Sequence, residues 1–276
     1  MKRLILTGIL VLATGFSGLM AQKKKKGDDN AQQAAQQTPG PHVKSQAEAE
    51  AVQALGKAED AQDQDAIIAA SESLLAKFAD TEFKDLALLL EAKAYQAKGD
   101  SAKAQIFAER SLEANPKNYQ TTMMLGELLA AHTGEHDFDR DEKLKNAEKY
   151  LNDAITAAGT APKPNPVVSD AAWDAAKKQI IAEGHNGLGM VALDRKDYDG
   201  AIKEFQTAYS GDPQPAYQVR MASAQISAGK FDDAIAICEK LMAEQQLPAQ
   251  IRQVAQAVRA QALSKKNASA PAAPKQ

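Results

Sequence analysis

The side chains most able to do chemistry lie in one short stretch, HTGEHDFDRDE, at residues 132–142. Two histidines four residues apart are followed by three alternating aspartates, as in some calcium loops: His132, His136, Asp137, Asp139 and Asp141. The metalloprotease order H-E-x-x-H is not met, because Glu135 lies third after His132 and Gly134 weakens a helix there. The aspartates also lack a calcium loop's glycine and its closing glutamate at the right distance. We therefore interpret the stretch, which ends at Glu142, as a solvated turn between helices, with a metal-dependent enzyme as the less favoured alternative.

The other reactive side chains are isolated. Cys238 is the single cysteine, which excludes a disulfide within the chain and a cysteine-based zinc cluster, and we expect it to pack as a buried thiol. In a helix, Glu183 and His185 would point in different directions, because they are two residues apart. No glycine-rich phosphate loop, nucleophile elbow or catalytic histidine–acid pairing is visible in the sequence. We predict a protein that is not an enzyme and has no metal and no cofactor, since an active site would need residues scattered along the chain.

Composition favours closely packed helices. Hydrophobic residues make up 44% of the 276-residue chain but aromatic residues only 5%, and alanine is frequent throughout. A core of small side chains is typical of helices that pack closely rather than of a β-sandwich. The formal net charge of −3 is nearly balanced and identifies no basic surface, so we predict no nucleic-acid partner.

Residues 1–21 have the pattern of a secretory signal peptide. A basic start precedes the apolar run LILTGILVLATGF, and GLMA ends at a small residue, Ala21, where cleavage is expected. We therefore predict an exported protein, periplasmic or secreted. The KKKK run at 23–26 opposes translocation, so an uncleaved anchor in the inner membrane, with membrane contact there alone, is the alternative. The polar residues 22–44 and 266–276 are predicted to be a disordered spacer and tail.

One spacing recurs along the remaining residues, 45–265. From Gly189, steps of 12, 4, 3 and 5 residues lead to Ala201, Phe205, Ala208 and Pro213. The same steps join Ala92, Ala104, Ala108, Ser111 and Pro116. Further copies are Ala222, Ala234, Cys238 and Leu241; Ala54, Ala66, Ala70 and Ser73; and, after nine inserted residues, Gly126, Ala147, Leu151 and Ala154. Five copies of one spacing indicate a repeated unit of two helices.

These residues resemble the tetratricopeptide repeat, a helix–turn–helix unit of 34 residues. The pairs Leu125-Gly126 and Leu188-Gly189 and the aromatic Tyr95 match further positions of the family. The resemblance implies an all-α, right-handed solenoid of about five repeats with a C-terminal capping helix. The predicted units are 47–80, 85–118, 119–158 with the insertion, 182–215 and 215–248, with the cap at 249–265. A helix extension from about Ser169 and a proline-broken loop at 160–166 are expected before the fourth unit.

The family binds protein partners through the concave face of the solenoid, on the first helix of each repeat. Carried onto this chain, that face would contain Leu89, Lys93, Met123, Met124, Glu127, Asn186, Met190, Arg220 and Ser223. The basic and amide residues are not in the arrangement of the family's carboxylate clamp, so no clamp is predicted. The methionines would suit an apolar or helical peptide, or else belong to the core. We predict a non-catalytic interaction scaffold in the cell envelope, with an assembly or coordination factor of the outer membrane or cell wall as the alternative.

Overall fold

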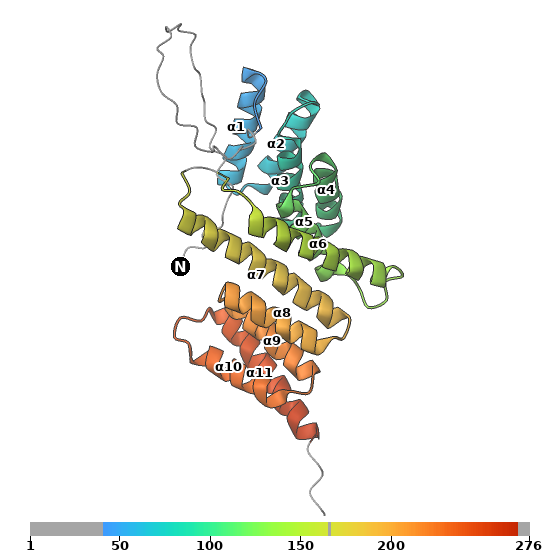
Figure 1. Ribbon diagram of the computed structural model, residues 1–276, viewed down its shortest axis with the longest axis vertical. Helices are drawn as coiled ribbons and strands as arrows, with labels where there is room; N and C mark the ends of the chain where they lie inside the picture. The colour runs from blue at the N-terminus through green and yellow to red at the C-terminus, as the bar shows by residue number, and fades with distance from the viewer. Residues whose placement is uncertain (1–40, 165–166, 270–276) are drawn as a thin grey trace, which may run out of the picture.

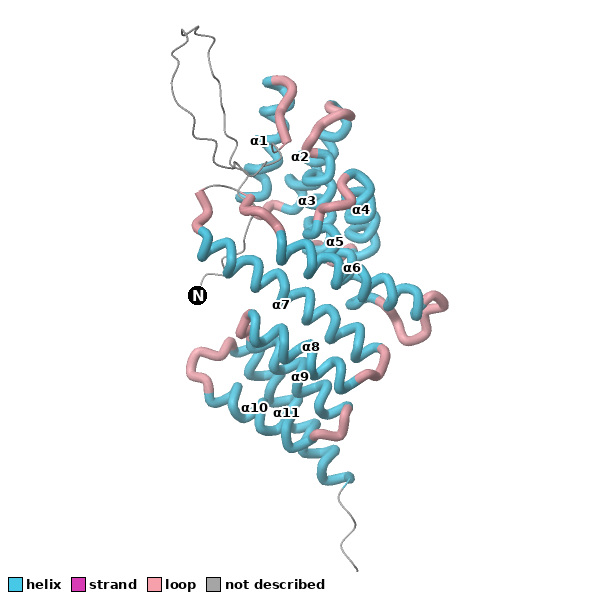
Figure 2. Tube along the Cα trace, viewed as in Figure 1, coloured by secondary structure: helices cyan, strands magenta, loops and turns pink. Residues whose placement is uncertain are grey.

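The computed structural model describes residues 41–164 and 167–269, and these form a curved stack of helices (Figure 1). The predicted signal peptide, most of the predicted spacer and the last seven residues lie outside the described residues. Within the described ranges there are eleven helices and no strand (Figure 2). Their bounds are α1 Gln46–Asp60, α2 Gln64–Lys77, α3 Lys84–Ala97, α4 Ser101–Ala114, α5 Tyr119–His132, α6 Arg140–Thr160, α7 Asp170–Asp194, α8 Tyr198–Gly211, α9 Pro215–Ser227, α10 Phe231–Ala243 and α11 Ala249–Ser269. The predicted all-α solenoid fold is confirmed.

The helices associate as consecutive pairs, α1 with α2 through α9 with α10, and each pair also packs against the next along the chain. The last helix, α11, lies against both α9 and α10 at the end of the stack (Figure 1). It continues to Ser269, four residues past the predicted end of the cap at 265, so part of the predicted tail is helical. Among the residues described, none of the helices combines the length and apolarity that a membrane crossing needs.

Four of the five pairs share one turn between their helices. In each, a residue with positive φ follows the first helix: Gln62 at 54°, Gly99 at 80°, Lys196 at 63° and Gly229 at 76°. In every turn the N–H of this residue and the N–H of the next residue donate to carbonyls at the same relative positions in the first helix. In one turn, Gly99 N–H donates to Gln96 O and Asp100 N–H donates to Tyr95 O. This is the helix C-cap with a left-handed residue. The repeat therefore extends to the backbone hydrogen bonds, and only the α5–α6 pair replaces the turn with a longer loop.

Small residues at the repeated positions let the paired helices approach closely. Among them, Ala92, Ala104, Ala147, Ala201, Ala208, Ala222 and Ala234 have no exposed surface. A Cβ added to Gly126 would lie 2.7 Å from Leu151 Cγ, and one added to Gly189 would lie 2.6 Å from the fully buried Phe205. Tyr95 stacks on Phe107 with the ring centroids 5.3 Å apart. The two prolines of the pattern, Pro116 and Pro213, are exposed in the turns after α4 and α8.

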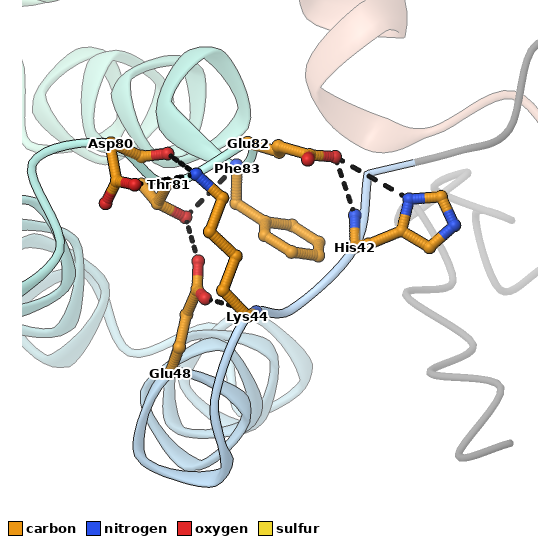
Figure 3. A network of polar contacts seen from close by, with 7 residues as sticks. All are labelled: His42, Lys44, Glu48, Asp80, Thr81, Glu82 and Phe83. Atoms are coloured by element: carbon orange, nitrogen blue, oxygen red, sulfur yellow. Dashed lines mark hydrogen bonds and ion pairs between the residues drawn. The ribbon is translucent and has the colours of Figure 1, made fainter. Parts of the chain in front are cut away.

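The end of the predicted disordered spacer is held against the first repeats (Figure 3). His42 donates its backbone N–H to Glu82 at 2.9 Å, and Lys44 Nζ lies 2.8 Å from Asp80 Oδ2. The predicted spacer, 22–44, is therefore too long at its C-terminal end, because His42 and Lys44 contact the turn between α2 and α3. Composition alone indicated disorder there, whereas acidic partners 36 to 40 residues away in the chain provide the contacts.

Candidate functional site

A groove of about 680 Å³ lies on the face formed by α3, α5, α7 and the start of α9. These are the first helices of four consecutive repeats, and the second helices contribute no residue to its lining. Side chains from positions as far apart as Lys93 and Tyr217 meet there. The groove is thus a product of stacking, and no single repeat contains it.

The N-terminal extension of α7 builds one wall of the groove. At 25 residues, α7 is the longest helix described, and the residues at 170–182 precede the part that belongs to the repeat. Ser169 caps it by accepting from the Ala172 N–H at 3.2 Å, and buried Trp173 donates its indole N–H to the Ala161 carbonyl at 3.1 Å. One face of α7 lines the groove, through Ala176, Gln179 and Ile180 of the extension and through Glu183, which follows it.

Four of the nine predicted contact residues line the groove: Lys93, Met123, Met124 and Glu127. Lys93 is exposed within the groove, and Glu127 is half-buried. Each methionine is 5% exposed and also belongs to a core cluster, Met123 between α5, α6 and α7 and Met124 between α3, α4 and α5. Each side chain therefore packs in the core, as one predicted alternative has it, and also lines the groove, where contact with a peptide stays a prediction.

The other five predicted residues are not part of the lining. Leu89 is 1% exposed in the core between α3, α4 and α5, and Met190 packs against the clusters around Phe205 and Val191. Ser223 donates its hydroxyl to the Val219 carbonyl of its own helix at 3.1 Å. The last two, Asn186 and Arg220, hydrogen-bond to each other. The family positions placed all five on the concave side. In the structure four of them contact neighbouring helices, and Ser223 bonds within its own helix.

Several lining residues were not predicted: Tyr119, Gln120, Gln179, Ile180, Glu183, Asp212, Gln214 and Tyr217. They come from the first turn of α5, the α7 extension and the segment entering α9. The apolar side of the extension, with Trp173, Ile180 and Ile181, was visible in the sequence. This apolar side indicated that the extension packs on the stack, but it did not indicate which residues the extension faces.

Carboxylates dominate the electrostatics of the groove. Burial and then nearby Glu183 raise the pKa of Glu127 to about 7, although Arg220 opposes the shift. Burial and then Asp212 raise the pKa of Glu183. Burial, then Glu183 and Asp212, raise the pKa of Tyr217 to about 12. Desolvation by the surrounding protein lowers the pKa of Lys93, although Glu183 favours its charged form. Burial is the first cause of each of these shifts, and it disfavours the charged form of the group.

The stretch at 132–142 has a different arrangement from a metal site. Asp137 accepts from the Gly134 N–H at 3.1 Å, and Lys143 lies 2.9 Å from both Asp137 and Asp139. His132 at the end of α5 shares a 2.9 Å hydrogen bond with the hydroxyl of Ser101. Within the described ranges, no three His, Cys, Asp or Glu side chains are grouped as metal ligands would be. The aspartates instead brace the α5–α6 loop.

The remaining reactive residues, Cys238 and His185, take part in packing and in contacts between helices. Cys238 has no exposed surface and packs with Ala234 and Leu241, and burial raises the pKa of its thiol. His185 Nδ1 lies 2.7 Å from Glu204 of α8, joining α7 to the helix paired with it.

The stack of helix pairs with a groove across their first helices defines a helical-repeat interaction scaffold. Two stretches, residues 87–118 and 192–263, match the tetratricopeptide repeat family. In these two stretches the chain contains tetratricopeptide repeats, the repeats of a family of generally non-catalytic proteins that bind protein partners.

Solved structures share this fold at low sequence identity. A thermophilic tetratricopeptide-repeat protein from Thermus thermophilus, TTC0263, is 18% identical with a TM-score of 0.54, over 76% of this chain and 98% of that one. PilW, described as a widely conserved type IV pilus biogenesis factor, is 17% identical with a TM-score of 0.53, over 83% of this chain and 96% of that one. No curated protein sequence matches this chain.

Proposed function

We propose that the protein is a non-catalytic scaffold that binds a segment of a partner protein in the groove between α3 and α9. The observation that supports this most directly is the groove itself, about 680 Å³ in volume and lined by four successive first helices. That volume is typical of a ligand site and holds several side chains of a peptide. A stack of packed helices loses little conformational entropy on binding, so the ordering of the partner segment is the main entropic cost.

A groove-filling variant tests this proposal. Gln179 is exposed on the α7 wall, and Gln179→Trp would fill the groove without removing a core contact. Gln206→Trp makes the same change on exposed α8, outside the groove. We expect a partner from a cell extract to be retained by the unaltered chain and by Gln206→Trp, and lost by Gln179→Trp. Equal retention by all three proteins would exclude the groove as the binding site.

We further propose that the protein works in the cell envelope. The signal-like pattern of residues 1–21 supports export, and an uncleaved membrane anchor remains the alternative. N-terminal sequencing of the protein from fractionated cells tests both. A mature chain that starts at Gln22 in a periplasmic or culture fraction supports export, and an intact chain in the membrane fraction supports the anchor. Intact protein in the soluble cytoplasmic fraction contradicts both.

An assembly role in the envelope is a second candidate. The fold shared with PilW, a pilus biogenesis factor, favours it alongside the signal-like segment. A deletion strain with normal envelope assemblies would contradict this role while leaving the scaffold proposal intact.

A further inference from the structure

The charges that line the groove are mostly negative. Glu127 of α5, Glu183 of α7 and Asp212 before α9 are carboxylates, whereas Lys93 of α3 is the single lysine or arginine in the lining described. Arg220 is close enough to lower the pKa of Glu127, but it donates to Asn186 and lies outside the lining. Within the described part of the chain, Glu127 has no hydrogen-bond or ion-pair partner, and its half-buried carboxylate opens to the groove.

Tyr217 provides a second, independent indication of a ligand. Its side chain is 6% exposed and lines the groove, yet among the described residues its hydroxyl has no hydrogen-bond partner. The hydroxyl is near enough to Glu183 and Asp212 for both to raise its pKa. The hydroxyl is not among the fully buried polar atoms, so it opens to the groove and is available to a group that enters there.

Apolar surface lies beside these polar groups. Met123 and Ile180 come from α5 and α7, and the ring of Tyr119 comes from the start of α5. Lysine and arginine have long aliphatic stems that pack on such surface while the charged end reaches an acidic group. The unbranched, polarizable methionine side chains adapt to stems of different shape.

We infer that the groove selects partner segments carrying a lysine or arginine, whose charged end lies among Glu127, Glu183, Asp212 and the Tyr217 hydroxyl while its stem packs on Met123 and Ile180. The inference rests on the proposed function, since it names the chemistry of the segment bound in that groove. The cation would supply the counter-charge that the lining lacks. An acidic segment would meet repulsion from the same three carboxylates.

The experiment is a selection of phage-displayed random seven-residue peptides on the full chain. The same peptide selection is run in parallel on three variants. They are the groove variant Glu127→Gln/Glu183→Gln, its matched control Glu109→Gln/Glu113→Gln at exposed sites of α4, and the groove-filling Gln179→Trp. Circular dichroism and urea denaturation verify that all four are folded. The best peptide is then synthesised, and its Kd is measured for each protein.

We expect the selected peptides to be enriched in lysine and arginine over the starting library. The peptide should bind about tenfold more weakly to the Glu127→Gln/Glu183→Gln variant, because each lost charge contact weakens binding, and equally well to the α4 control. It should not bind Gln179→Trp.

The opposite results separate the inference from the proposed function. Peptides without a basic excess that are still lost by Gln179→Trp would overturn the charge inference and leave the groove as the binding site. Basic peptides that bind the Glu127→Gln/Glu183→Gln variant unchanged would overturn it in the same way. Peptides kept by Gln179→Trp, or no enrichment on any protein, would overturn both.

Discussion

Arg220 of α9 donates from Nη1 to the side-chain oxygen of Asn186 of α7, with 2.5 Å between the two atoms. The bond joins the first helices of adjacent repeats, and Asn186 is only 9% exposed at that junction. It holds the guanidinium near Glu127, where it opposes the rise in the pKa of that carboxyl. The same bond therefore joins two repeats and positions a positive charge near the carboxyl group of Glu127.

A double-mutant cycle should detect this bond. Arg220→Met keeps most of the aliphatic stem, and Asn186→Ala removes the acceptor. We expect a coupling free energy of unfolding of about 1 kcal/mol, as for a hydrogen bond to a charged group that is partly open to water. Urea denaturation of the four proteins measures it. Additive effects would show that the contact does not stabilise the stack.

Two glycine substitutions should have opposite effects on stability. In Gly189→Ala the added Cβ meets the Phe205 ring at 2.6 to 2.9 Å, where Phe205 is fully buried and cannot move aside. We expect a loss of about 1–3 kcal/mol from overpacking. In Gly159→Ala, near the end of α6, the Cβ meets no atom within 4 Å, and the better helix propensity should give a gain of up to about 1 kcal/mol. Thermal denaturation compares them, and a Gly189→Ala protein as stable as the parent would contradict the tight contact.

The carboxyl group of Glu91 should destabilise the protein at neutral and higher pH. Both its oxygens are buried in α3 without a hydrogen bond, and burial, with Glu72 adding, raises its pKa from 4.5 to about 7. The folded state thus binds the proton more tightly than the unfolded state, so stability falls as pH rises from about 4.5 to 7.

Glu91→Gln removes this titration. We expect a gain of up to about 3 kcal/mol in the free energy of unfolding at pH 8, and little difference near pH 4, where both states of the parent are protonated. Urea denaturation at the two pH values measures the gain, with Glu113→Gln at an exposed site of α4 as the control. An equal effect of Glu91→Gln at both pH values would rule out the linkage.

Thr81 and Glu48 form a buried hydrogen bond between the α2–α3 turn and α1, with 2.6 Å between Thr81 Oγ1 and Glu48 Oε1 (Figure 3). Thr81→Val keeps the shape of the side chain but leaves a carboxylate oxygen of the 1%-exposed Glu48 without this donor. We expect a loss of about 1–3 kcal/mol. Thr207→Val, on exposed α8, should change stability by less than about 0.5 kcal/mol in the same denaturation assay. Equal losses in the two variants would contradict a special role for Thr81.

The thiol of Cys238 should react slowly in the native protein. It has no exposed surface, and burial raises the pKa of the thiol, so the reactive thiolate is both scarce and inaccessible. Labelling with a chromogenic disulfide reagent should become fast only in denaturant. Rapid labelling without denaturant would mean that the α9–α11 end of the stack opens readily.

The repeated unit was predictable because its signals are local. Ala201, Phe205 and Ala208 are spaced so that one helix face meets its partner, and all three are fully buried. Asp100 and Asp197 cap the helices that follow the shared turn, each accepting a backbone N–H from its own first turn. Such contacts lie within a few residues of each other, so the order of residue types alone is enough to indicate them.

The groove depended on contacts between distant residues. Leu89 and Lys93 lie one turn apart on α3, yet Leu89 is in the core and Lys93 in the groove. Glu127 lines the same groove as Asp212 and Tyr217, which lie more than eighty residues further along the chain, and the long helix α7 forms one of its walls. The sequence by itself determined the helices, their turns and the stacked repeats through short-range spacing. Only the tertiary structure decided which faces of those helices are buried and which carboxylates share the groove, because that depends on the angles at which whole helices pack.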